Sequence, residues 1–480
     1  MITPWLLVLL GVAIANGGVT KERNSSRVVI VGAGAAGLAA SKRLLDHGFD
    51  DFIILEANDR VGGRIHSVRF GDAIIDLGAE YCAGEGVYNL VKDLGVLKPK
   101  GTVSNGYHST SGSLEPTFTN GLFGVHSILE SAEKDNRSSR AAHIQKFFKS
   151  AVVQIYGDEH ERHLAYDCVD LIEKINLIYA SAFFLEDLSA ADSHVDYPGK
   201  VVYNWNGHGF QTVLRALLKD HNLDDRINLN SAVRKIEWGS EEVKLTTSNG
   251  AEFFAEHVIL TPSLGVLKHK RAISFYPPLP AEKVDAIDML GYGTTNAIAL
   301  YFPERWWTNP NMVFIFSKTG GGVSGFTEGP RRNGKSWLDT LFGFTALEQN
   351  PNALFASFTG EFAPDIELCS DDVIIDGIMY AIRKFVGVNA TRPTKWLRRN
   401  WYHDPSMRGT YSYETVRSWR NGAARENLAK PLASRAGRPQ LLFAGEAAHR
   451  EYYATVHGAF ETGYREAERI INCYGPTKKN

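Results

Sequence analysis

The chain has 480 residues, of which 44% are hydrophobic, so it is long enough for two or more domains with sizeable cores. Its 52 lysines and arginines almost balance 54 aspartates and glutamates, so no overall charge favours nucleic acid or an anionic membrane surface. A small molecule is therefore the expected partner, and neither nucleic acid binding nor stable membrane insertion is expected.

The first eighteen residues, MITPWLLVLLGVAIANGG, are typical of a secretory signal peptide. The apolar run from about Pro4 to Ala15 is too short to span a bilayer, and it ends in an A-x-A sequence and other small residues. No lysine or arginine precedes the run, so a short uncleaved anchor or a wrongly assigned start is the alternative interpretation. We expect residues 1–18 to be removed and the mature protein to be secreted.

The four cysteines are widely spaced, at Cys82, Cys168, Cys369 and Cys473. They form no C-x-x-C motif and have no histidine pair nearby, so neither a metal site nor a dithiol redox motif is predicted. An even number of cysteines in a secreted chain permits disulfides, but the sequence does not determine how they would pair.

Residues 27–56 carry the strongest pattern in the chain. The β-branched run at 28–31 is typical of a strand buried on both faces, and a helix is predicted over 35–45. The turn between them contains the glycines of a G-x-G-x-x-G motif, Gly32, Gly34 and Gly37. The first glycine allows the tight turn, the second lets a pyrophosphate approach the backbone, and the third lets the helix pack on its strand. The turn is therefore predicted to bind phosphate at the N-terminus of the helix.

A second apolar strand, predicted over 52–55, ends in Glu56. An acidic side chain at this place can accept hydrogen bonds from ribose hydroxyls and disfavours a 2′-phosphate. The glycine motif alone would be weak evidence, but strand, glycines, helix, second strand and acid together predict a bound ADP moiety. They do not distinguish NAD from FAD.

The next turn, NDRVGGR, contains two arginines, Arg60 and Arg64, and two glycines, Gly62 and Gly63. Arginines beside paired glycines can donate to a second phosphate, as a dinucleotide laid across a sheet would need. A solvated surface turn is an equally good interpretation of these residues. The stretch that follows, DLGAEYCAG at 76–84, is predicted to be a strand end and a glycine turn.

The composition changes twice in the rest of the chain. Residues 87–200 mix amphipathic helical stretches with polar loops, and residues 301–395 are rich in Phe, Trp and glycine loops, as expected for a second domain. Residues 401–468 return to the first pattern, with a buried strand in LLFAGEAAH and a helix from Ala459 onward. Further short strands are predicted within 227–238, 243–247 and 257–261.

We therefore predict an α/β protein with two interleaved domains. The cofactor-binding domain is predicted to comprise residues 27–95, 200–298 and 396–475, and the substrate-binding domain residues 96–199 and 299–395.

Several longer motifs identify a family resemblance, and they extend over nearly the whole mature chain. They are VVIVGAGAAGLAA, ILEANDRVGGR, DLGAEY, VILTPSLGVLK, MRGTYSY and LLFAGEAAHREYYATVHGAFETGYREAERI. With these motifs the chain resembles the flavin-containing amine oxidases, and among them the animal polyamine (spermine and N1-acetylpolyamine) oxidases. The resemblance implies a Rossmann-like FAD-binding domain interleaved with an α+β substrate-binding domain.

The resemblance also implies site residues. Glu56 would hold the adenosine ribose, Arg64 would lie along the FAD, and Val233 would meet the adenine through its backbone. The cofactor-binding positions are Gly32, Gly34, Ala35, Ala36, Gly37, Glu56, Ala57, Arg64, Gly78, Ala79, Glu80, Val233, Glu446, Thr455 and Val456. Where monoamine oxidases carry a cysteine bonded to the flavin, this chain has Thr410, so non-covalent FAD is expected.

The catalytic positions implied by the resemblance are Trp401, Tyr411 and Thr455, with the two aromatic rings as walls of the amine site. The implied reaction is oxidation of a polyamine such as spermine, spermidine or an acetylated form, by hydride transfer to the flavin and reoxidation by O₂ to give H₂O₂. Long cationic substrates need acidic groups at the mouth of the site, and Glu80 and Glu85 are candidates, although surface carboxylates are common.

Two departures from the family pattern leave an alternative open. Relatives carry a lysine that holds a water near the flavin at the position of Ala297, and a His or Glu at the position of Ala83. The alternative is a flavin-binding protein with reduced or lost catalysis that acts as a binding module. A third interpretation, an NAD-linked dehydrogenase, would require added nicotinamide and would show no yellow chromophore.

Overall fold

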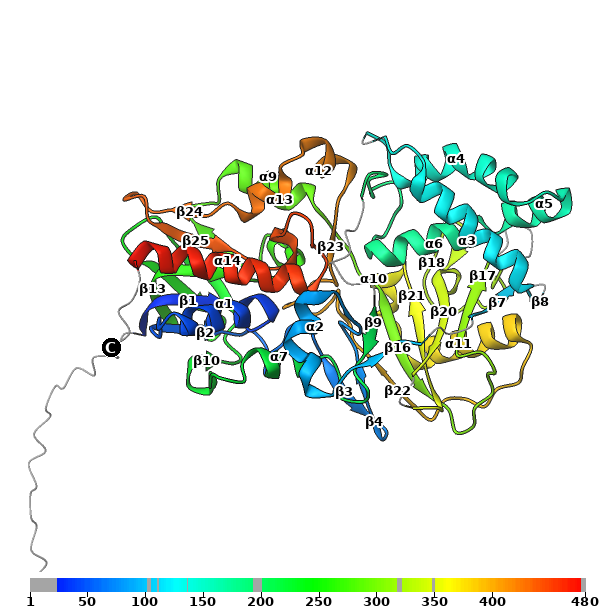
Figure 1. The fold of residues 1–480 in the computed structure, drawn as a ribbon, viewed down its shortest axis with the longest axis horizontal. Helices are drawn as coiled ribbons and strands as arrows, with labels where there is room; N and C mark the ends of the chain where they lie inside the picture. The colour runs from blue at the N-terminus through cyan, green and yellow to red at the C-terminus, as the bar shows by residue number, and fades with distance from the viewer. Residues whose placement is uncertain are drawn as a thin grey trace, which may run out of the picture.

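The computed structural model describes residues 24–101, 105–109, 112–135, 137–192, 201–316, 322–347 and 350–475. The predicted signal peptide, residues 1–18, lies outside the described residues. Two β-sheets, each with its own helices, lie side by side along the long axis of the molecule (Figure 1).

The first sheet has nine strands, and its centre is parallel. β1 (Ser25–Val31) pairs with β2 (Phe52–Leu55) on one side and with β13 (Glu252–Leu260) on the other, and β25 (Pro439–Phe443) pairs with the end of β13. The remaining strands are β10 (Ile227–Asn228), β11 (Val233–Glu237), β12 (Val243–Thr247), β14 (Ser274–Tyr276) and β24 (Leu432–Ala433). Strands from the beginning, middle and end of the chain therefore form one sheet.

Two helices, α1 (Ala35–Asp46) and α14 (Val456–Tyr474), run side by side over this sheet (Figure 1). Their backbones approach so closely that a Cβ atom at Gly463 would lie 2.2 Å from the carbonyl oxygen of Ala36. Each helix follows a parallel strand: α1 starts shortly after β1, and α14 follows β25 with the turn η4 (Glu446–Ala448) between them. The N-termini of both helices therefore lie at the carboxyl edge of the sheet, where ligands of such folds bind.

The second sheet has seven strands. In spatial order they are β22 (Lys395–Arg398), β16 (Asn296–Tyr301), β21 (Ala353–Phe358), β20 (Leu341–Ala346), β17 (Asn311–Ile315), β7 (Asn105–Ser109) and β8 (Gly112–Ser113). Only the β7–β17 pair is parallel.

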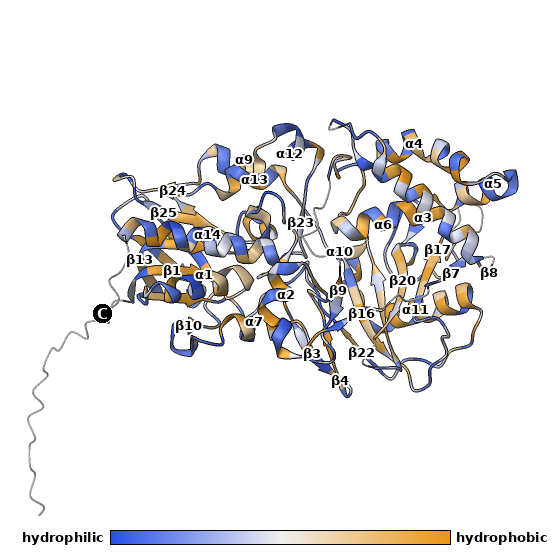
Figure 2. Ribbon diagram, in the orientation of Figure 1, coloured by the Kyte–Doolittle hydropathy of each residue, from blue (hydrophilic) through white to orange (hydrophobic). Residues whose placement is uncertain are grey.

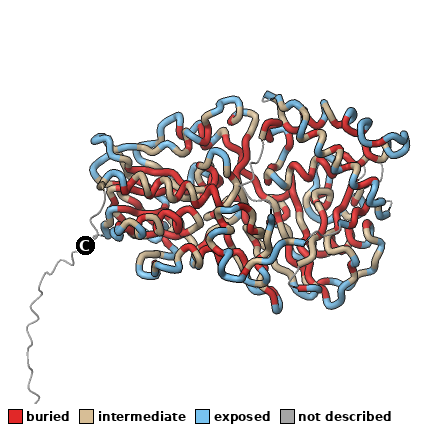
Figure 3. Tube along the Cα trace, in the orientation of Figure 1, coloured by how far each residue is buried: buried red, intermediate tan, exposed pale blue. Residues whose placement is uncertain are grey.

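Each face of the second sheet is covered by different elements. α11 (Asp371–Val386) packs on the face that presents Leu300 and Phe314. Helices α3 (Pro116–Ser131), α4 (Arg140–Ile155) and α6 (Val169–Ala180) pack on the opposite face near Val313 and Ile315, and the hairpin of β3 (Ser67–Phe70) and β4 (Ala73–Asp76) packs there near Ala299. Apolar residues gather along both sheets (Figure 2), and the buried stretches run through both (Figure 3).

Short elements complete the fold. The small strands are β5 (Cys82–Ala83), β6 (Lys98–Pro99), β9 (Val202–Asn204), β15 (Gly291–Tyr292), β18 (Arg331–Arg332), β19 (Lys335–Ser336) and β23 (Ser412–Tyr413). The other α-helices are α2 (Glu85–Val91), α5 (Glu159–Asp167), α7 (Thr212–Leu217), α8 (Leu264–Lys268), α9 (Ala281–Met289), α10 (Ala363–Ile366), α12 (Val416–Asn421) and α13 (Ala424–Ala429). The 3₁₀ turns are η1 (Lys92–Leu94), η2 (Asp224–Arg226), η3 (Trp337–Thr340) and η4 (Glu446–Ala448).

The predicted α/β class, with a Rossmann-like domain and an interleaved second domain, is confirmed. The predicted boundary between residues 298 and 299, however, falls inside β16, and the whole of β16 pairs in the second sheet. The chain therefore enters the second sheet before Asn296, where β16 begins.

The described residues contain no disulfide, since all four cysteines are free. Among the helices in the described ranges, none combines the length and apolar character needed to cross a membrane.

Candidate active site

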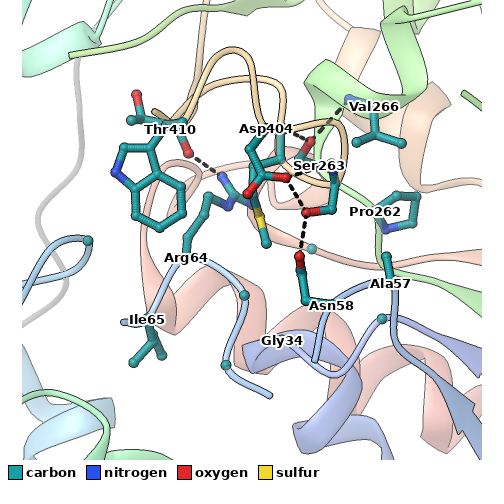
Figure 4. Close-up of a pocket in the computed structure, with 18 of the residues that line it drawn as sticks. Gly34, Ala57, Asn58, Arg64, Ile65, Pro262, Ser263, Val266, Asp404 and Thr410 are labelled. Atoms are coloured by element: carbon teal, nitrogen blue, oxygen red, sulfur yellow. Dashed lines mark hydrogen bonds between the residues drawn. The ribbon is translucent and has the colours of Figure 1, made fainter. Parts of the chain in front are cut away.

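A cavity of about 1050 Å³ lies where the two sheets meet, at the carboxyl edge of the first sheet. Its size is at the upper end of the range for small-molecule sites, about 300–1,000 Å³. Its lining joins the turn after β1, the turn after β2, the start of β16 and the loop that follows β22. Figure 4 shows Asn58, Arg64, Asp404 and Thr410 around this cavity.

The glycine turn forms one end of the cavity. Gly32 has a φ of +108°, which favours glycine, and a Cβ atom at Gly37 would lie 2.0 Å from the carbonyl oxygen of Gly32. Gly37 thus serves the helix–strand contact and does not line the cavity, whereas Gly34, Ala35 and Ala36 do. No side chain caps the N-terminus of α1, so an anion would satisfy its first N–H groups.

The carboxylate of Glu56 connects the second strand to the glycine turn. It accepts hydrogen bonds from the N–H of Ala33 at 2.7 Å and from the N–H and side chain of Asn58 at 2.8 and 2.9 Å. Glu56 and Ala57 line the cavity, as does Val233 at the start of β11. The residues predicted for the adenosine end therefore lie together, with Asn58 beside them.

The two arginines of the NDRVGGR turn have different roles. The guanidinium of Arg60 donates to the carbonyls of Val61, Gly63 and Ile65, so it stabilises its own loop. Arg60 therefore fits neither of the two interpretations given above, a phosphate contact or a solvated surface turn. Arg64 lines the cavity and donates to the carbonyl of Thr410 at 2.6 Å (Figure 4).

Glu446 is the acidic partner of Arg64, at 2.9 Å. It also accepts hydrogen bonds from the Ser412 hydroxyl at 2.6 Å and from the N–H of Ala454 at 2.8 Å. Burial alone would raise the pKa of Glu446, but the charge of Arg64 and the hydrogen bond from Ser412 outweigh it and lower this pKa. The cavity wall therefore carries a fixed, buried ion pair.

Two aromatic rings also belong to the lining of the cavity. The indole N–H of Trp401 donates to the carbonyl of Leu77 at 3.1 Å, and the hydroxyl of Tyr411 donates to the carbonyl of Ile178 at 2.8 Å. Burial raises the pKa of Tyr411 to about 12. The indole N–H and the phenol hydroxyl thus both hydrogen-bond to backbone carbonyls, while Trp401 and Tyr411 line the cavity.

The two predicted threonine positions also line the cavity, but their hydroxyls have structural partners. Thr455 caps α14: its oxygen accepts from the N–H of Gly458 at 3.0 Å and donates to the carbonyl of Tyr452 at 2.7 Å. The Thr410 hydroxyl pairs with Ser181. The hydroxyl of Thr455 is therefore placed to orient α14, and its predicted catalytic role gains no support from these contacts.

The structure does not bring every predicted residue to the cavity. Gly78, Ala79 and Val456 line it, but Glu80 does not, and the carbonyl of Glu80 accepts a hydrogen bond from the indole of Trp205. Glu85 also lies outside the lining. Of the two departures from the family pattern, Ala297 lines the cavity and Ala83 does not.

Several lining residues were missed from the sequence. Asp404 and Ser406 come from the loop after β22 and hydrogen-bond to each other, and Ser406 also donates to Asn58 at 3.1 Å (Figure 4). Ser263 caps α8 and bonds the carbonyl of Met407. The D-P and T-P dipeptides at Asp404 and Thr261 were signals of turns, but no local pattern shows that these turns face the glycine motif.

The lining fits a dinucleotide. It combines an uncapped helix N-terminus, glycines in both turns, an acid at the end of the second strand and a half-buried arginine. A Cβ atom at Gly34 would lie 4.0 Å from the Cα of Gly63, which is van der Waals contact, so the two glycines let the two turns approach closely.

Comparisons with known proteins agree with this site. The model of the flavin containing amine oxidoreductase family matches residues 35–471. Probable polyamine oxidase 5 of Arabidopsis thaliana is 29% identical over 94% of this chain and 98% of its own length. The peroxisomal N(1)-acetyl-spermine/spermidine oxidase of Homo sapiens is 29% identical over 96% of this chain and 98% of its own length.

Two further matches are more limited, one in the share of the relative that is covered and one in sequence identity. Lysine-specific histone demethylase 1 homolog 1 of Arabidopsis thaliana is 30% identical over 92% of this chain, but only 52% of its own length is covered. A double mutant of putrescine oxidase shares the fold, with a TM-score of 0.68 and 19% identity over 94% of this chain and all of that one. The chain belongs to the flavin-containing amine oxidoreductase family and is an FAD-dependent amine oxidoreductase.

Proposed function

We propose that this protein oxidises a polyamine or a related long amine and delivers the electrons to O₂ as H₂O₂. The observation that carries the proposal is a single cavity whose lining includes both a dinucleotide cradle and the rings of Trp401 and Tyr411. FAD, when bound, supplies the hydride acceptor and the reaction with O₂. Two relatives matched over 98% of their length are named probable polyamine oxidase 5 and peroxisomal N(1)-acetyl-spermine/spermidine oxidase, which also supports the proposal.

The chain's own residues would prepare the amine. Trp401 is buried and Tyr411 is half-buried, and their polar atoms are satisfied by backbone carbonyls, so the wall they form is apolar. An apolar wall disfavours an ammonium group and favours the neutral amine, which is the form that can give up a hydride. The Arg64–Glu446 pair and the N-terminus of α14 would orient the ring of the cofactor.

We also propose that the FAD is held without a covalent bond. Thr410 stands where the attachment cysteine of monoamine oxidases is expected, and a threonine hydroxyl offers no thiolate. Denaturing the purified protein with acid and spinning it down tests this attachment. Yellow colour in the supernatant supports it, and flavin that stays in the pellet refutes it.

An absorption spectrum tests the activity directly. The purified holoenzyme is mixed with spermine without oxygen, and the flavin band near its visible maximum is followed. The expected result is bleaching, with one H₂O₂ per amine oxidised after air is admitted. A flavin that keeps its colour with spermine, spermidine and acetylated polyamines would remove the proposed activity.

A second candidate function, flavin binding with reduced or lost catalysis, is favoured by Ala297. Its methyl group lines the cavity where a polar side chain is expected from the resemblance. The variant Ala297→Lys decides between the two. If the variant oxidises amines much faster than the wild type, the wild type is a weakened enzyme. If the wild type already turns over as fast as the variant, this candidate is excluded.

We further propose that the mature protein is secreted, on the basis of residues 1–18. Expression of the full chain in cultured cells, followed by N-terminal sequencing of the protein in the medium, tests this. Protein in the medium that begins near residue 19 supports secretion, and protein retained in cells with an intact N-terminus refutes it.

A further inference from the structure

The segment that carries Trp401, residues 398–403, is hydrogen-bonded to one turn of the second half of the molecule. The segment begins at the last residue of β22, and the turn, residues 366–371, joins α10 to α11. Every residue of the segment except Tyr402 lines the cofactor cavity. The position of the segment therefore shapes this cavity.

Glu367 makes the central contact between the turn and the segment. One oxygen of its carboxylate accepts a hydrogen bond from the N–H of Tyr402 at 2.9 Å, and the other accepts from the N–H of His403 at 2.9 Å. The Nδ1 atom of His403 lies 3.1 Å from the second oxygen. The carbonyl of Glu367 accepts from the side-chain amide of Asn400 at 3.2 Å. Glu367 thus binds the chain on both sides of Trp401.

This carboxylate is almost completely removed from water, since the Glu367 side chain is 1% exposed. Burial raises its pKa, whereas the hydrogen bonds from Tyr402 and His403 favour the ionised form. A buried carboxylate is costly, and an apolar side chain that serves packing alone would often be as stable or more so at such a place. The carboxylate is explained if its two oxygens fix the positions of two particular N–H groups.

Arg398 attaches the beginning of the segment to the same turn. Its guanidinium donates to the carbonyl of Ile366 at 3.0 Å and to the carbonyl of Cys369 at 2.9 Å, and it pairs with Asp371 at 3.0 Å. Trp401 therefore lies between two points of attachment, one at Arg398 and one at the N–H groups that Glu367 binds.

The ring of Trp401 is held by the first half of the molecule. Its indole N–H donates to the carbonyl of Leu77 at 3.1 Å, and a Cβ atom at Gly78 would lie only 3.3 Å from the ring. Trp401 is 4% exposed. The backbone on either side of Trp401 is thus bound by one half and its ring by the other, so a shift of the backbone must move the ring.

We propose that Glu367 is a positioning residue, which sets the place of the Trp401 ring in the cofactor cavity by binding the N–H groups of Tyr402 and His403. Glu367 does not line the cavity itself and acts only through the segment. The proposal rests on the proposed function only for the role of Trp401 as a wall of the amine site.

The variant Glu367→Gln tests this role. Glutamine keeps the size and one acceptor oxygen of the side chain, but it turns an NH₂ group towards one of the two backbone N–H groups. Amide hydrogen exchange of the holoenzyme at residues 402–403 should become about tenfold faster or more, because hydrogen bonds to a charged group are lost. The visible circular dichroism of the bound FAD, which reports the surroundings of the flavin ring, should change shape.

The matched control is Asp339→Asn. The carboxylate of Asp339 also accepts a backbone N–H in the second half, from Ser336 at 2.7 Å, but Asp339 does not line the cofactor cavity. Both variants are expected to lower the melting temperature, and only Glu367→Gln should alter the circular dichroism of the flavin. A purely structural role of Glu367 would lower the melting temperature without this spectroscopic change.

Arg398→Met is a second variant, which keeps the proposal testable if Glu367→Gln does not fold. It detaches the same segment at its beginning and leaves no buried charge, since Asp371 is half exposed. The expected change in circular dichroism is of the same kind and smaller. Loss of FAD from a folded variant, with FAD retained by the Asp339 control, would also support the proposal.

Unchanged circular dichroism of the flavin in both Glu367→Gln and Arg398→Met would overturn the inference, because the ring would then keep its place without these contacts. Equal spectral changes in the Asp339 control would overturn it as well, since the effect would be general loosening. Oxidation of spermine in air is measured separately. Spectral changes in a protein that oxidises no amine support the inference and refute the proposed function, and oxidation with unchanged spectra does the reverse.

Discussion

Glu446 is a buried carboxylate that holds Arg64, Ser412 and the N–H of Ala454 at the cofactor cavity. Glu446→Gln would leave the charge of Arg64 buried without its partner, so we expect a loss of about 3 kcal/mol in the free energy of unfolding. We also expect the dissociation constant for FAD to rise about tenfold or more. Chemical denaturation of the apoprotein and a fluorescence titration with FAD measure the two effects.

The control for this prediction is Glu468→Gln. Glu468 pairs with Arg43 at the same distance of 2.9 Å, but both side chains are about 40% exposed, so its loss should cost less than about 1 kcal/mol and leave FAD binding unchanged. Equal effects of the two substitutions would contradict the role given to Glu446. The pKa of Glu446 is lower in the folded state than the ordinary pKa of a glutamate. Its contribution to stability is therefore present when the pH is above the ordinary pKa, and it is lost as the pH falls through the lowered pKa.

For Asp76, at the end of β4, we expect the free energy of unfolding to depend on pH with the opposite sign. Burial raises its pKa to about 7, even though the Ser67 hydroxyl and the N–H of Phe210 donate to it and lower the pKa. The folded state therefore binds a proton more tightly than the unfolded state does. The stability that this proton contributes is complete below about pH 4 and is lost as pH rises towards 7.

Asp76→Asn should remove this dependence. Between pH 5 and pH 8 the wild type should lose roughly 2 kcal/mol more unfolding free energy than the variant, because the asparagine does not titrate. Urea unfolding of both proteins at several pH values measures the difference, which isolates Asp76 from the other titrating groups. Parallel curves for the two proteins would show that Asp76 is ionised in the folded state at neutral pH.

Single elements were predictable where their causes are local. The run FIIL gave β2 with its observed limits, and the alternation in VKLTT did the same for β12. Pairings between distant segments were not predictable: β16 joins β21 and β22 because its apolar faces meet theirs, and no local pattern selects these partners. For the same reason the sequence indicated Glu56 but missed Asp404, which a loop some 350 residues away brings to the same cavity.

The contact between α1 and α14 gives a prediction at the scale of elements. A Cβ atom at Gly463 would lie 2.2 Å from the carbonyl oxygen of Ala36 and 3.1 Å from the nitrogen of Ala40, and backbone atoms cannot move aside cheaply. Gly463→Ala should therefore lose about 1–3 kcal/mol of unfolding free energy, although alanine favours a helix by about 1 kcal/mol. FAD affinity should fall as well, because α1 carries the phosphate-binding turn.

Thermal unfolding and FAD titration check this prediction. Gly157→Ala is the matched control, since nothing lies within 4 Å of the Cβ atom it would add. Helix propensity alone would make Gly463→Ala stabilising. An unchanged or raised melting temperature would mean that the two helices move apart freely, and the close contact would then have no energetic role.

The whole molecule is organised so that neither half closes the cofactor cavity alone. The first sheet supplies the glycine turn and Glu56, whereas the start of β16 and the loop after β22 come from the second sheet. The chain crosses between the halves before β16, since the whole of this strand pairs in the second sheet. A ligand that fills the whole cavity therefore contacts both halves and should restrain both. A ligand that fills only the part formed by the first sheet should restrain that half alone.

FAD and ADP make this coupling measurable. At a hundred times its dissociation constant either ligand should stabilise the protein by about 2.7 kcal/mol, because this gain depends only on saturation. The two ligands should protect different parts of the backbone. Both should slow amide hydrogen exchange at residues 32–37, but only FAD should slow it at residues 401–411, since ADP has no flavin ring to place against Trp401 and Tyr411. Exchange followed by mass spectrometry resolves the two regions. Equal protection of 401–411 by ADP would show that the two halves are already locked together without the flavin ring, and the aromatic wall would then be preformed.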